Sequence, residues 1–130
     1  MRIIMFLFVG VICPIVSFAL DVEQAKIAMA EDLAKCAGFY FAMSVLKNGN
    51  TSPPTEVSKA LFERGKQANK LATTYSADEK QLGQIGGAAA EMFIFMSTKP
   101  EWEKTYQVYA ENCKSILEKP EDRFQFLLNK

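Results

Sequence analysis

Apolar residues recur at helical spacing in four successive segments of this chain, and this periodicity restricts the fold more than any other feature. In the first segment, residues 21–46, one stripe alternates steps of four and three residues. Its members are Met29, Leu33, Cys36, Tyr40 and Met43. No stretch of useful length alternates apolar and polar residues as a half-buried strand does. The pattern therefore predicts an all-α fold.

Short polar connections separate the helical segments. Residues 47–50, with the sequence Lys-Asn-Gly-Asn, end the first helix with residues typical of a C-cap. Ser52 before Pro53 is a start signal, so the second helix is predicted to begin at Pro53 and to run to about Thr74. Connections this short favour antiparallel neighbours.

Two capping boxes predict the helices that follow. Ser76 with Glu79 precedes the third helix, and Thr98 with Glu101 precedes the fourth. Four helices of similar length with short connections favour an up-down-up-down four-helix bundle. A short C-terminal helical tail is expected after Pro120, and it is predicted to dock Phe124, Leu127 and Leu128.

The N-terminal segment has the plan of a secretory signal peptide. Arg2 precedes an apolar run over residues 3–16, and the small residues Ser17 and Ala19 precede an acidic, polar chain. Cleavage after Ala19 makes residues 1–19 a signal peptide and residues 20–130 one helical bundle domain. The mature protein is expected to be periplasmic or secreted, without stable membrane insertion. An uncleaved anchor is the alternative, but a spanning helix needs about 20 residues and the run is shorter.

Signal-peptide cleavage determines how many cysteines the mature protein contains. Cleavage removes Cys13 and leaves Cys36 and Cys113. An even number of cysteines in an exported chain predicts one disulfide, with two separate buried thiols as the alternative. In the predicted bundle the two cysteines differ in height by only about 5 Å on the first and fourth helices. A disulfide between these helices is therefore predicted, and it would close a loop of about 78 residues.

Histidine is absent from the sequence, and this narrows the possible functions. Its absence excludes His-based catalytic triads, His-ligated haem and the usual zinc sites. Serines and lysines lie in no recognisable nucleophile motif, and carboxylate pairs such as Glu31-Asp32 are expected to be caps or solvated charge. Fifteen basic and fifteen acidic residues without a basic cluster argue against nucleic-acid binding. We therefore expect no enzyme activity and no cofactor.

Glycines and methionines of the third helix each allow two interpretations. Three glycines within five residues are expected to permit close approach of another helix, with a hinge as the alternative: Gly83, Gly86 and Gly87. Met92 and Met96 are expected in the core. The alternative is that their thioethers bind copper(I).

Aromatic residues gather toward one end of the predicted bundle. Residues 39–41 and 93–95 are apolar around more than one helical face, whereas a bundle helix buries one stripe. Phe39 and Phe93 lie off the main stripes and are expected to be partly exposed. Such excess apolar surface is typical of interaction sites, although the C-terminal tail is an alternative cover. The candidate interface consists of Phe39, Phe41, Phe62, Phe93, Phe95 and Trp102.

The predicted plan, a small exported helical bundle closed by one disulfide, resembles type II secretion pilotins and the helical immunity proteins that neutralise toxins in the bacterial periplasm. This resemblance is architectural and carries no residues over. It departs from pilotins at Cys13, because Ile12 is not the small residue that a lipoprotein signal requires. The expected function is non-enzymatic binding of a protein partner in an adaptor, inhibitor or immunity-type role, with a homodimer as one form. The alternative is a carrier of a small apolar ligand near Met43, Met92 and Tyr106.

Overall fold

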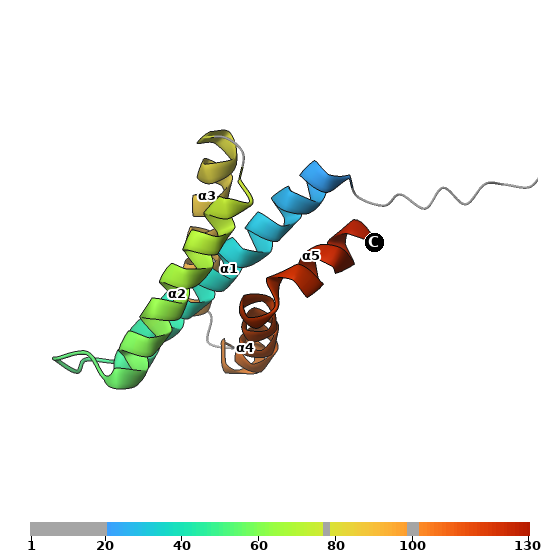
Figure 1. The fold of residues 1–130 in the computed structure, drawn as a ribbon. Coiled ribbons are helices and arrows are strands. Elements are labelled where there is room, and N and C mark those ends of the chain that lie inside the picture. Colours follow the sequence, from blue (N-terminus) through green and yellow to red (C-terminus); the bar gives the residue numbers. More distant parts are fainter. Residues whose placement is uncertain (1–20, 77–78, 99–101) are drawn as a thin grey trace, which may run out of the picture.

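The computed structural model describes residues 21–76, 79–98 and 102–130, and the regular elements among them are all α-helices. They follow one another as α1 Val22–Asn48, α2 Glu56–Thr74, α3 Glu79–Thr98, α4 Trp102–Glu118 and α5 Pro120–Leu128 (Figure 1). The predicted all-α fold is confirmed for this part of the chain. The predicted signal peptide, residues 1–19, lies outside it.

The central helix of the molecule is α1. The Asp21 carboxylate caps its N-terminus by accepting a hydrogen bond from the Gln24 amide at 2.8 Å. The helix ends at Gly49, whose φ of 56° suits glycine and whose amide donates to the Val45 carbonyl. Buried residues occur on every side of its C-terminal half, because other helices pack around it: Cys36, Ala37, Gly38, Phe39, Tyr40, Ala42, Met43 and Ser44.

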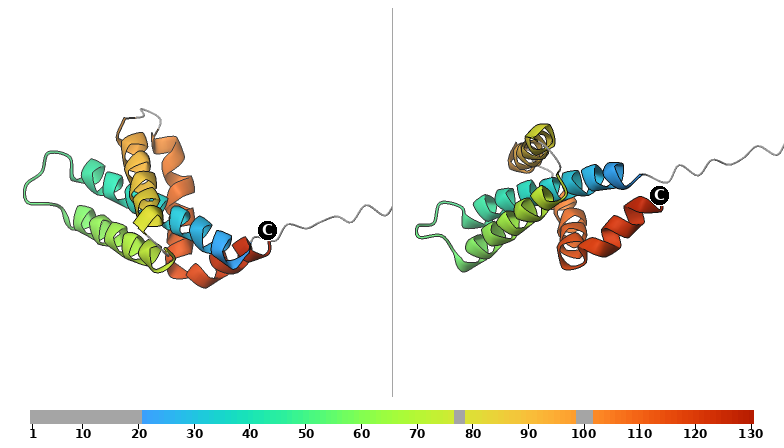
Figure 2. Two further views of the ribbon diagram at one scale, coloured as in Figure 1. Left: turned by 90° about the horizontal axis from the view of Figure 1, so that it is seen from above. Right: turned by 45° about the horizontal axis from the view of Figure 1, so that its top comes forward.

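The helices are arranged around α1 rather than as a regular bundle. The most extensive contacts of α1 are with the antiparallel α2 and then with α3 (Figure 1). Figure 2 shows that α3 and α4 cross the α1–α2 pair steeply, on opposite sides of it, and that α5 turns back toward the start of α1. Contacts between α2 and α3 are few. The predicted up-down-up-down topology is therefore not confirmed, because α1 buries more than the single stripe that such a bundle requires.

Glycines set two of the close approaches between helices. A Cβ atom at Gly38 of α1 would overlap the carbonyl oxygen of Ala89 in α3. A Cβ atom at Gly65 of α2 would lie 2.6 Å from ring carbons of Phe41. Three glycines of α3 have no atom within 4 Å of such a Cβ: Gly83, Gly86 and Gly87. The expectation that these three serve helix packing is therefore wrong, since the close contact of α3 uses Gly38 instead.

Helix α2 begins three residues later than predicted. The Thr55 hydroxyl accepts a hydrogen bond from the Ser58 amide at 3.1 Å. The side-chain oxygen of Asn48 accepts one from the Thr55 amide at 3.0 Å. These two hydrogen bonds fix the first turn of the helix at Glu56, so the predicted start at Pro53 is wrong.

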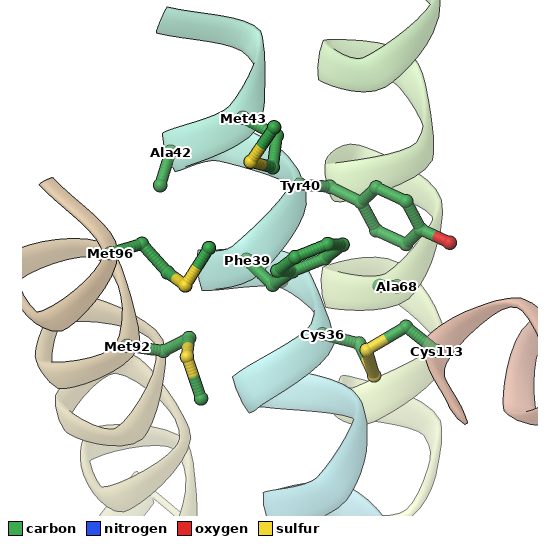
Figure 3. Close-up of a cluster of buried hydrophobic side chains, with 10 residues drawn as sticks. Cys36, Phe39, Tyr40, Ala42, Met43, Ala68, Met92, Met96 and Cys113 are labelled. Atoms are coloured by element: carbon green, nitrogen blue, oxygen red, sulfur yellow. A yellow bond between two sulfur atoms is a disulfide. The ribbon is translucent and has the colours of Figure 1, made fainter. Parts of the chain in front are cut away.

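The first of two core clusters surrounds the disulfide. Cys36 and Cys113 join α1 to α4 with their Cα atoms 5.3 Å apart, which confirms the predicted pairing. Figure 3 shows Phe39 beside this disulfide, with Met92 and Met96 reaching toward it from α3. Both methionines are buried, as expected for core residues.

The second core cluster lies along the N-terminal half of α1 and includes α5. Leu127 is 4% exposed there, and the rings of Phe124 and Tyr75 lie 5.6 Å apart. An ion pair adds to the contact, with Arg123 Nη2 2.7 Å from Asp32 Oδ2. The predicted C-terminal helical tail is thus confirmed, but it packs on the start of α1 and does not cover the aromatic residues near the end of that helix.

Candidate binding surface

Phe39, one of the six predicted interface aromatics, is a core residue. It is 1% exposed, and its ring lies 5.8 Å from that of Tyr106 and 6.0 Å from that of Tyr109. The expectation that Phe39 is partly exposed is wrong. Although the residue lies off the main stripe of α1, α4 crosses α1 at this point and covers it with two tyrosines.

Phe93 and Phe95 have an intermediate environment. Both are half-buried and pack against the first core cluster from α3. Each therefore contributes to the core and also reaches the surface. Trp102 begins α4, and its side chain lies outside the part of the structure that is described.

Phe41 and Phe62 form an aromatic pair across α1 and α2. Their ring centroids lie 5.3 Å apart, with the ring planes at 51°. Phe41 is half-buried, whereas 48% of Phe62 is exposed. We call this pair the aromatic surface. It joins two of the predicted residues at a place where a large apolar side chain faces solvent.

Charged and polar side chains of α2 border the aromatic surface. An open hollow of about 560 Å³ begins at Phe41 and continues along α2, and its other lining residues are Glu63, Lys66, Gln67, Asn69, Lys70 and Thr73. Ion pairs on the same helix join Lys59 to Glu56 at 2.8 Å and Lys66 to Glu63 at 3.0 Å. The hydrogen bond from Lys59 lowers the pKa of Glu56, so that carboxylate is charged at neutral pH. An apolar centre with a charged border is the usual anatomy of a protein interface.

A separate cleft of about 370 Å³ lies between α1, α4 and α5. Cys36 and Cys113 contribute to its lining, but their sulfur atoms are joined and supply no thiolate. Arg123 donates from Nε and Nη2 to the same Asp32 oxygen at 2.9 and 2.7 Å. The ion pair connects residues far apart in the sequence, so no local pattern predicts it. The guanidinium of Arg123 and the carboxylate of Asp32 form an ion pair that holds α5 against α1.

Tyr40 is a buried polar residue between α1, α2 and α4. Burial raises the pKa of its hydroxyl, and the guanidinium of Arg64 lies 5.9 Å from its ring centroid. Figure 3 shows the hydroxyl pointing away from the core cluster. Two small hollows of about 180 and 170 Å³ share Tyr40, Arg64 and Lys114. The phenol is therefore neutral at physiological pH.

Within the described ranges, no three His, Cys, Asp or Glu side chains gather in a group that would hold a metal ion. No helix of residues 21–76, 79–98 and 102–130 combines the length and apolar character needed to cross a membrane. Met43 and Met92, expected near a carried apolar ligand, are buried members of the first core cluster, together with Phe39.

The chain was also compared with known proteins. Neither protein-family models, nor curated proteins, nor solved structures gave a match to this chain.

Proposed function

We propose that this protein is a non-enzymatic binding protein that acts through contact with another protein, in an adaptor, inhibitor or immunity-type role. The observation that supports the proposal is the aromatic surface. Phe62 leaves 48% of its area exposed, and the ring that supports it, Phe41, also reaches the surface. The contact surface is centred on these two rings.

The pairing of two aromatic rings favours this surface over Phe126, a single exposed ring on α5. An aromatic residue in the centre of an interface can carry about 2 kcal/mol or more of binding free energy. Phe62 has the area for such a contact, whereas Phe39 is already buried within the monomer. The charged residues along α2 supply the polar border that excludes the wrong partners.

The disulfide supports an exported location for this activity. Cys36–Cys113 pairs α1 with α4, and such bonds persist mainly in oxidising compartments. Together with the signal peptide predicted at residues 1–19, this bond supports a periplasmic or extracellular location for the proposed activity. The bond also secures α4, which makes few other contacts with α1.

The proposal is tested by partner capture with mature protein, residues 20–130, on an envelope extract. Phe62→Ala should reduce recovery of the captured protein at least about tenfold. Its melting temperature should hardly change, because an exposed side chain adds little to folding stability. Val108→Ala is the matched control, since Val108 is 60% exposed but lies on α4.

Capture should survive in the Val108→Ala variant. Equal recovery with wild type and Phe62→Ala would contradict the proposal. So would equal losses in the two variants, because binding would then depend on general surface properties and not on the aromatic surface.

A further inference from the structure

Four charged residues form a stripe along the exposed side of α2. They follow one another at steps of three, four and three residues, which places them on one helical face: Glu56, Lys59, Glu63 and Lys66. Their side chains are between 54% and 89% exposed. We call them the charged stripe. The residues that α2 buries belong to another side of the helix: Ser58, Gly65, Ala68 and Ala72.

The charged stripe is complementary to itself about Leu61. Glu56 and Lys66 lie five residues before and after Leu61, and Lys59 and Glu63 lie two residues before and after it. A two-fold axis perpendicular to α2 at this level would pair two copies of the helix antiparallel. Glu56 would then face Lys66 of the second copy, and Lys59 would face Glu63. Each of these four charges would meet its opposite, whereas Lys70, four residues after Lys66 on the same face, would lie beyond the start of the partner's helix.

Phe62 lies beside the charged stripe, three residues after Lys59 and four before Lys66. Rotation about the same two-fold axis places the equivalent lateral faces of the two α2 helices on the same side of the interface. It therefore brings Phe62 of one copy next to Phe62 of the other, with Phe41 supporting each ring. One arrangement thus joins the apolar centre and matches the charges around it.

We propose that a second copy of this chain docks on α2, so that two α2 helices pack antiparallel in a symmetric homodimer. The proposal rests on the proposed function, because it names the partner of the same aromatic surface. Charge complementarity selects a second copy as the occupant. A symmetric interface uses one patch twice, and the alternation of sign about Leu61 gives this patch the required self-complementarity.

The two parts of the interface have different roles. Exposed ion pairs contribute little free energy each, so the charged stripe sets orientation and register. Phe62 contributes most of the affinity. Contact along a single helix is small for a protein interface, and the dimer is therefore expected to dissociate on dilution from the micromolar range.

Two charge variants test the arrangement by sedimentation equilibrium. Glu56→Lys with Glu63→Lys makes the stripe wholly basic, and Lys59→Glu with Lys66→Glu makes it wholly acidic. Each variant alone should dimerise at least about tenfold more weakly than wild type, because like charges face each other. An equimolar mixture should form a one-to-one heterodimer. Helix content from circular dichroism checks that both variants are folded.

The possible results distinguish failure of the homodimer from failure of the proposed protein-binding function. A wild-type protein that stays monomeric at high micromolar concentration overturns the homodimer, whereas loss of partner capture in Phe62→Ala would still support the binding surface. Self-association of both charge variants at wild-type strength overturns the antiparallel arrangement on α2. Heterodimer formation in the mixture, with each variant alone monomeric, supports it.

Discussion

Replacement by alanine is expected to have opposite effects on stability at Gly38 and Gly83, because the surroundings of these two helical glycines differ. Gly38 of α1 lies against the backbone of Ala89, so the added methyl group of Gly38→Ala would force α1 and α3 apart. Overpacking of this kind costs about 1–3 kcal/mol. Gly83 of α3 has no atom within 4 Å of an added Cβ. Gly83→Ala should therefore stabilise the protein by about 0.5–1 kcal/mol through helix propensity.

Urea unfolding of the two alanine variants measures this difference directly. The unfolding free energy should fall for Gly38→Ala and rise for Gly83→Ala. A rise in both variants would contradict the close approach of α1 and α3 at Gly38, because helix propensity alone favours alanine at both positions.

At the scale of the element, α5 is held by an inward leucine. Leu127 is 4% exposed within the second core cluster, so Leu127→Ala should lower the unfolding free energy by about 2–5 kcal/mol. Phe126 is the adjacent control, at 53% exposed, and Phe126→Ala should change it by less than about 1 kcal/mol. Chemical denaturation of the two variants checks the orientation of α5. A larger loss in Phe126→Ala would mean that the opposite face of the helix is docked.

Sequence patterns located the helices well because caps and periodicity act within one turn. The C-terminal helix begins at Pro120 as predicted, and α3 and α4 begin two and three residues after the first helical positions, 77 and 99, that the capping residues predict. The start of α2 was missed because Asn48, seven residues earlier in the chain, binds the Thr55 amide. A connection across a loop has no local pattern that predicts it.

The arrangement of the whole molecule was less accessible from sequence. The two cysteines expected in the mature chain were sufficient to predict the bond between α1 and α4, although the antiparallel bundle assumed for their levels is not confirmed. The angles at which the helices cross were not predicted. Residues on all sides of α1 are buried, and its apolar stripes do not indicate which helix covers each side. This explains the candidate site as well: Phe39 and Phe41 are both aromatic residues of α1, yet α4 covers Phe39 and leaves Phe41 beside Phe62.

The central claim at this scale is that a second copy contacts the charged stripe of α2. A zero-length carbodiimide cross-linker, which couples an amine to a carboxylate already in contact, tests it on an equilibrated mixture of isotope-labelled and unlabelled mature protein. Mass spectrometry should find Lys59–Glu63 and Lys66–Glu56 linkages that join a labelled to an unlabelled peptide. If coupling on α2 yields linkages between peptides of the same isotope alone, such as Lys59–Glu56 and Lys66–Glu63, the pairs are internal to one chain and the claim is contradicted.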